Sequence, residues 1–226
     1  LLAGGDPFGL YVLSVALSGI ATISLILVVG MLAGEVADSQ WASLLAGGAL
    51  FTMPPLFWYP ALGFSPKAVV LCLGMVAILF ALQDRPYAAG IAGAVAAGTW
   101  QLSVVFVGIV LGISALRGGV KRTGKVVASV VVVALIVVSP VIVMGGGMAM
   151  LVEAVFIPLT GSESGPLIFR VLKAASLLGF AAITVAIGAW GVSHTVRHNW
   201  SDAWWLVVGF GFGILQMVVD LDYFPD

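Results

Sequence analysis

Residues 54–117 read PPLFWYPALGFSPKAVVLCLGMVAILFALQDRPYAAGIAGAVAAGTWQLSVVFVGIVLGISALR. Polar residues are concentrated in short turns at 64–67, 83–86 and 99–101, and apolar runs connect these turns. A bilayer core leaves no water for the backbone, so apolar runs between polar turns predict membrane-crossing helices. Successive turns are therefore expected at opposite faces of the membrane.

The composition of the whole chain supports the same class. Of its 226 residues 62% are hydrophobic and 8% are charged, and the mean hydropathy is +1.20. Ordinary globular domains carry about a quarter charged residues, and a soluble fold could not shield this much apolar surface. Continuous apolar runs favour helices over barrel strands, which alternate in polarity. The net charge of −1 gives no indication of a nucleic-acid partner.

The predicted fold is an all-α polytopic bundle with about seven to eight crossings or re-entrant segments, forming one transmembrane domain over residues 1–226. Pro54 and Pro55 should kink or end one helix. The short segment Tyr87–Gly98 needs tilt or a re-entrant geometry, and its small residues favour close helix packing. The expected spans are 10–34, 41–62, 66–82, 87–98, 100–116, 126–144, 167–192 and 203–219, with a short interfacial piece at 148–158. The chain is expected to be a fragment of a longer protein.

Basic residues in short loops set the predicted orientation. The densest basic cluster, Arg117 to Lys125, is placed in the cytoplasm as a loop. Counting spans back from it puts the turn Asp84-Arg85 in the cytoplasm and residues 65–67 and 99–101 outside. Six basic side chains then lie inside and three lie outside, namely Lys67, Arg170 and Lys173.

Ser65-Pro66-Lys67 opens a predicted helix on the outer face. A helix N-terminus bearing a lysine offers free backbone donors and a point charge to a phosphate. The alternative is that Lys67, like Arg170 and Lys173, reaches towards lipid headgroups. The single cysteine, Cys72, lies inside an apolar run and is expected to be a small buried side chain.

Four motifs carry a resemblance to a known family. They are Pro55-Leu-Phe-Trp-Tyr59, Phe64-Ser-Pro66, Gln83-Asp-Arg-Pro86 and the small-residue run from Ala89 to Thr99. In this order they resemble the GT-C class of membrane glycosyltransferases, and most closely the dolichol-phosphate-mannose mannosyltransferase-like proteins of archaea. The resemblance implies transfer of a sugar from a polyprenyl-phosphate donor to an acceptor on the extracytoplasmic face, as in protein glycosylation.

The resemblance also implies an acidic residue in the first outside loop that acts as a base or a metal ligand. The alignment it suggests makes residues 10–34 the second helix, so that loop would lie mostly before Leu1. Asp6 is the weak candidate within the chain. The leaving phosphate needs cations where charge develops, which favours Lys67 with Ser65, followed by Arg170 and Lys173. Trp100 is a candidate for stacking on a sugar and Gln101 for binding its hydroxyls, although interfacial anchoring also explains Trp100.

Two groups raise the possibility of a divalent cation. Asp220 and Asp222 can supply carboxylates to a hard cation beside a phosphate, although a solvated loop after the last span is the favoured explanation. His194 and His198 are four residues apart, as metal ligands on one helix face are, but no third ligand is near them in the sequence.

Two other function classes stay open at this point. A transporter or permease would use the proline-broken and glycine-rich helices as moving parts, but almost no charged residue lies in mid-membrane. A non-catalytic membrane scaffold would use its small-residue faces to pack against a partner. Acidic residues in an outside loop upstream would favour the transferase, whereas acids within helices would favour a carrier.

Overall fold

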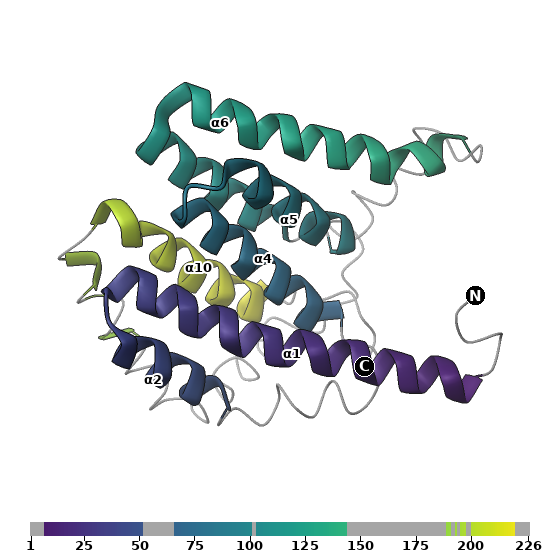
Figure 1. Ribbon diagram of the computed structural model, residues 1–226, viewed down its shortest axis with the longest axis horizontal. Coiled ribbons are helices and arrows are strands. Elements are labelled where there is room, and N and C mark those ends of the chain that lie inside the picture. The colour runs from purple at the N-terminus through teal and green to yellow at the C-terminus, as the bar shows by residue number, and fades with distance from the viewer. Residues whose placement is uncertain are drawn as a thin grey trace. The chain divides into compact units, whose positions relative to one another are not determined.

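The computed structural model describes residues 7–51, 66–100, 103–143, 189–190, 193, 195–197 and 200–219. The helices in these ranges are α1 (Pro7–Ala37), α2 (Gln40–Phe51), α4 (Pro66–Leu82), α5 (Pro86–Thr99), α6 (Val104–Val143) and α10 (Trp200–Val219) (Figure 1). The prediction of an all-α fold is confirmed for them. The chain divides into two compact units, residues 1–137 and 138–226. The predicted pieces at 148–158 and 167–192 and the Pro54-Pro55 break lie outside the described residues.

Helices α1 and α2 form an antiparallel hairpin. Asp38, which follows α1, has a left-handed backbone with φ 47°, and the Ser39 N–H donates to Gly34 O at 3.2 Å. The Ser39 hydroxyl then accepts a hydrogen bond from Ala42 N at 3.5 Å, as expected of an N-cap. A Cβ added at Gly34 would meet Ser43 Cβ at 3.2 Å, so glycine lets the two helices approach closely.

Helices α4 and α5 form a second hairpin. Residues 83–85 connect them in a tight turn that ends α4. Asp84 is left-handed with φ 61°, and Arg85 N donates to Phe80 O at 2.9 Å across the turn. This bond completes a Schellman-type C-terminus, which aspartate tolerates better than most residues. Pro86 then starts α5, where its missing N–H costs nothing. Helix α4 has the bounds predicted from the sequence, and α5 extends the predicted segment by one residue at each end.

Helix α6 is two helical segments joined at Gly119. This glycine has φ 59° and ψ −156°, a conformation that side-chain-bearing residues avoid. Both segments pack on α5, because Gly93 lies against Val107 of the first segment and Gly98 against Val137 of the second. The prediction of a loop at residues 117–125 is therefore wrong in form: these residues are helical with a one-residue break. A Gly-Gly pair allows that reversal without a loop.

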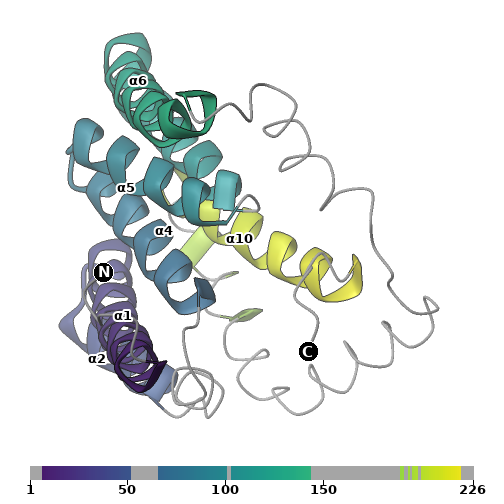
Figure 2. The ribbon, with the colours of Figure 1, turned by 90° about the vertical axis from the view of Figure 1, so that its right-hand side faces the viewer.

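The arrangement of the first unit follows from these contacts. Helix α4 packs against both α1 and α5, and Figures 1 and 2 show it between them. Cys72 of α4 is buried and unbonded, as predicted. The buried faces are built largely from small and β-branched residues, such as Ala77, Ala89 and Val110. Such faces let helix backbones approach without needing bulky interlocking side chains.

Two described stretches are long and apolar enough to cross a membrane by length and composition: residues 8–37 and residues 104–139, of which the second includes the break at Gly119. Large apolar side chains on them are exposed, among them Ile20 and Leu27 of α1 and Leu135 of α6. Such surfaces suit lipid rather than water. Helix α5 has 14 residues, which is about 21 Å against a hydrocarbon core of about 30 Å. Its predicted shortness is confirmed, and its full crossing stays a prediction.

Candidate functional site

Two of the predicted site residues lie in the part of the chain that the structure describes. Lys67 is half-buried in the first turn of α4, and Trp100 is half-buried at the C-cap of α5. Because α4 and α5 are consecutive antiparallel helices, the start of one and the end of the other lie at the same end of the hairpin. We call it the outer end, because the sequence predicts that it faces outward. The other predicted residues lie outside the described ranges: Asp6, Ser65, Gln101, Arg170, Lys173, Asp220 and Asp222.

Ser103 joins this outer end, and the sequence did not single it out. Its N–H donates to Trp100 O at 2.9 Å, which fixes the turn between α5 and α6. The side chain is 1% exposed, and its hydroxyl has no hydrogen-bond partner among the described residues. A polar residue directly before an apolar run is the signal that could have identified it, since this is the position of a helix N-cap.

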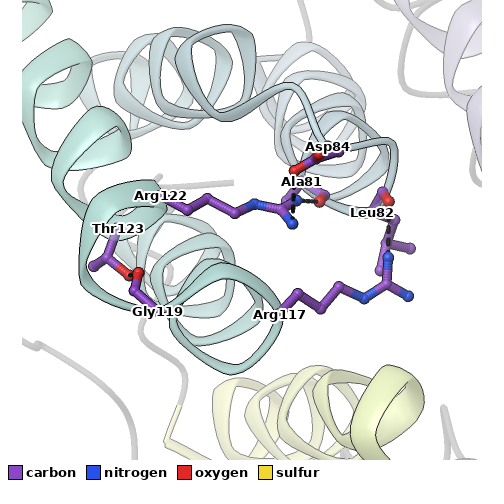
Figure 3. Close-up of polar contacts among 7 residues, drawn as sticks. All are labelled: Ala81, Leu82, Asp84, Arg117, Gly119, Arg122 and Thr123. Atoms are coloured by element: carbon purple, nitrogen blue, oxygen red, sulfur yellow. Dashed lines mark hydrogen bonds and ion pairs between the residues drawn. The ribbon is translucent and has the colours of Figure 1, made fainter.

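The opposite end of the same hairpin is held by two arginines from α6 (Figure 3). Arg117 Nη1 donates to Leu82 O at 2.7 Å, and Arg122 Nη2 donates to Ala81 O. Arg122 Nη1 also lies 2.8 Å from Asp84 Oδ1. The last carbonyls of a helix have no partner within the helix, and here two guanidinium groups supply the donors. Positive charge at a helix C-terminus is also favoured by the helix dipole.

The break at Gly119 explains how both arginines reach one helix end. In an unbroken helix, side chains five positions apart are rotated by about 140° about the helix axis, so Arg117 and Arg122 would point in different directions. The reversal at Gly119 brings them together, and the Thr123 hydroxyl donates to Gly119 O at 3.0 Å beside the break. A Cβ at Gly118 would overlap the Arg122 side chain, so Gly118 leaves room for it.

The remaining cations gather at this end as well. Lys125 Nζ lies 5.7 Å from the centre of the Tyr87 ring at the start of α5. The Arg85 guanidinium lies 6.0 Å from the centre of the Phe80 ring at the end of α4. The basic end is defined here as Arg85, Arg117, Lys121, Arg122 and Lys125. These contacts bring the Asp84-Arg85 turn and the Arg117–Lys125 cluster to the same end of the α4–α5 hairpin, as predicted, and the membrane face at which this end lies stays a prediction.

The basic end and the outer end are far apart along the hairpin. Lys67 and Leu82 are fifteen helical steps apart in α4, which corresponds to about 22 Å along the axis. A phosphate held by Lys67 would therefore lie beyond the reach of the arginines that cap α4. Among the described residues no group of three or more histidine, cysteine or acidic side chains gathers as metal ligands do. His194 and His198 lie outside them.

Comparison with known proteins gives a consistent result. The sequence model of a family described as DolP-mannose mannosyltransferase matches residues 1–139. A curated relative from Haloferax volcanii, named dolichol phosphate-mannose mannosyltransferase, is 28% identical over 222 residues. That alignment covers 98% of this chain and 48% of the relative, so the chain spans about half the length of the protein it matches. No solved structure matches the chain.

Proposed function

Because the chain belongs to the DolP-mannose mannosyltransferase family, we propose that it forms part of a membrane enzyme that transfers mannose from a dolichol-phosphate donor. The acceptor binds on the extracytoplasmic face, and the reaction takes place at the outer end. The match of residues 1–139 to the family model carries this proposal.

Lys67 binds the donor phosphate in this proposal. The bond between the sugar and the phosphate oxygen breaks during transfer, so negative charge accumulates on the departing phosphate and a nearby cation stabilises it. Lys67 is the described cation in the first turn of α4, where backbone N–H groups have no partner within the helix. Ser65, Arg170 and Lys173 add polar and basic groups to the same predicted face.

Trp100 and Gln101 hold the sugar. An indole face packs against the C–H groups of a pyranose ring, and an amide bonds to its hydroxyls. The N–H of buried Ser103 donates to Trp100 O and thereby fixes the backbone that presents the indole. The general base is an acidic residue, and Asp6 is the candidate inside this sequence. A divalent cation, if the enzyme uses one, has Asp220 and Asp222 as its proposed ligands.

The described helices offer little support for a carrier. Charged residues in α1, α4 and α5 stand only near helix ends, at Glu35 and Lys67. Ion-coupled carriers need ionisable groups near the bilayer midplane.

The test measures mannose transfer from labelled dolichol-phosphate mannose in membranes that contain the product of the complete gene. Lys67→Ala should lower the rate at least about tenfold, because one charge-assisted contact in the transition state is lost. Lys67→Arg should recover part of the rate. Lys121→Ala is the matched control, since it removes an exposed lysine at the basic end. Equal rates for Lys67→Ala and Lys121→Ala would reject the phosphate role, and absence of transfer by the unaltered enzyme would reject the proposed reaction.

A further inference from the structure

We propose that the basic end binds the headgroups of anionic phospholipids in the surrounding bilayer, with Arg85, Lys121 and Lys125 as the contact residues. This surface lies at the opposite end of the α4–α5 hairpin from Lys67 and takes no part in the proposed sugar transfer. The inference therefore does not depend on the proposed function.

The charge at this end is strongly unbalanced. Five cations lie there with one acidic side chain, Asp84, and that carboxylate is already paired with Arg122 at 2.8 Å. The other acidic side chains in the described part of residues 7–137 are Glu35 and Asp38, which belong to the α1–α2 turn on the same predicted membrane face, so the cations at this face still outnumber the acids. Like charges this close repel one another, so the end gains stability when an anion from outside the protein approaches.

Two of the five cations donate hydrogen bonds to the fold, and the other three are the proposed contacts with the lipid. Arg117 and Arg122 donate to the carbonyls at the end of α4. Arg85 and Lys125 each lie over an aromatic ring. A ring face attracts the cation without accepting conventional N–H hydrogen bonds from it, so their donors remain able to bind a phosphate. Lys121, which lies between Arg117 and Arg122 in the sequence, is exposed.

The apolar side chains beside these cations indicate a lipid rather than a soluble anion. Leu116 is 65% exposed and Val120 is 90% exposed, on either side of the break in α6. Tyr87, whose ring lies under Lys125, is 55% exposed. Exposed leucine and valine suit the acyl region, while tyrosine and lysine are typical of the headgroup level. The exposed leucine and valine thus provide an apolar surface for acyl chains, and the neighbouring cations can bind the lipid phosphate.

The experiment titrates the purified product of the complete gene, in a neutral detergent, with phosphatidylglycerol or phosphatidylcholine and counts bound lipids by native mass spectrometry. The unaltered protein should prefer phosphatidylglycerol, and the preference should weaken as salt is added. The double variant Lys121→Gln/Lys125→Gln should raise the apparent Kd for phosphatidylglycerol at least about tenfold, since each lysine near an anionic surface contributes about fivefold. Both side chains are exposed, so folding should be unaffected, and a melting curve checks this.

The matched control compares two single variants: Arg197→Gln removes one exposed charge from another part of the chain, and Lys121→Gln removes one exposed charge from the basic end. Arg197→Gln should leave the phosphatidylglycerol affinity within about twofold of the unaltered protein, whereas Lys121→Gln should weaken it about fivefold. An equal loss in both single variants would overturn the proposal, because net charge alone would then explain binding. Equal affinity for the two lipids would also overturn it. Displacement of the lipid by millimolar inorganic phosphate would overturn it in favour of a soluble anion.

Discussion

Gly90 of α5 lies directly against Ser129 of α6, so closely that a Cβ on the glycine would overlap the serine hydroxyl and meet Val126 O at 2.8 Å. The Ser129 hydroxyl is itself bonded to Val126 O at 2.8 Å. This hydrogen bond lies within α6 and holds the hydroxyl beside Gly90, so a side chain at residue 90 could be accommodated only if the two backbones moved apart. Transmembrane helices that lack a hydrophobic driving force between them depend on such contacts.

Gly90→Ala should therefore destabilise the helix pair by about 1–3 kcal/mol, the usual range for overpacking a tight contact. Thermal unfolding in detergent measures the loss. The double variant Gly90→Ala/Ser129→Ala should recover part of the stability, because it removes the hydroxyl but leaves Val126 O in place.

Gly108→Ala provides the control for that substitution. Gly108 also lies in a helix, but a Cβ there would meet no atom within 4 Å. Alanine should stabilise the helix slightly, by about 1 kcal/mol or less. An equal loss for Gly90→Ala and Gly108→Ala would contradict the close packing of α5 on α6.

Gly119→Ala is expected to be costly for a different reason. A Cβ at Gly119 has space around it, but the backbone has φ 59° and ψ −156°. A residue forced into such a region costs about 1–3 kcal/mol. Alanine would also favour continuing the helix through the break, which would separate Arg117 from Arg122. The melting temperature should fall for Gly119→Ala and stay constant or rise for Gly124→Ala, where φ is not positive and the site is open. No difference between the two variants would refute the break.

The helix bounds could be predicted where the sequence carries strong end signals. Pro66 starts α4 and Gln83-Asp84-Arg85-Pro86 ends it and starts α5, because proline restricts the backbone on both sides of itself. The break at Gly119 could not be predicted in the same way. A basic run between apolar runs looks like a loop, and its helical form depends on the carbonyls of α4 that its arginines reach, which lie more than thirty residues earlier in the sequence.

Arg122 and Asp84 should respond unequally to substitution, although they form one ion pair. The Arg122 side chain is 10% exposed, whereas that of Asp84 is 79% exposed. Arg122→Leu leaves Ala81 O without its donor at a partly buried helix end, which costs about 1–3 kcal/mol. Asp84→Asn keeps a residue that tolerates the left-handed backbone and removes only a solvent-exposed pairing, so it should cost less than about 1 kcal/mol. Unfolding free energies for the two variants, measured side by side, give the comparison. A larger loss for Asp84→Asn would mean that the ion pair, and not the carbonyl cap, holds the α4–α5 turn.

The candidate site was predicted less completely than the helices, for a physical reason. Lys67 and Trp100 could be placed at the ends of spans because a lysine or a tryptophan beside an apolar run is typical of the membrane interface. Their shared end of the hairpin follows from the antiparallel direction of α4 and α5. Ser103 was missed because a serine beside an apolar run carries no charge, and its burial depends on neighbours that the sequence does not reveal.

The direction of α5 through the membrane is the relationship on which both proposals depend, and two cysteine substitutions test it. In a Cys72→Ala background, Thr99→Cys and Lys121→Cys place exposed thiols at opposite ends of the bundle. An impermeant thiol reagent added to intact cells should label the Thr99→Cys variant, and the Lys121→Cys variant only after the cells are made permeable. The reverse result would place the basic end outside, against the positive-inside tendency. Labelling of both variants from one side would mean that neither α5 nor the first segment of α6 crosses the membrane. Lys67 and the arginine-capped turn would then lie at the same membrane face.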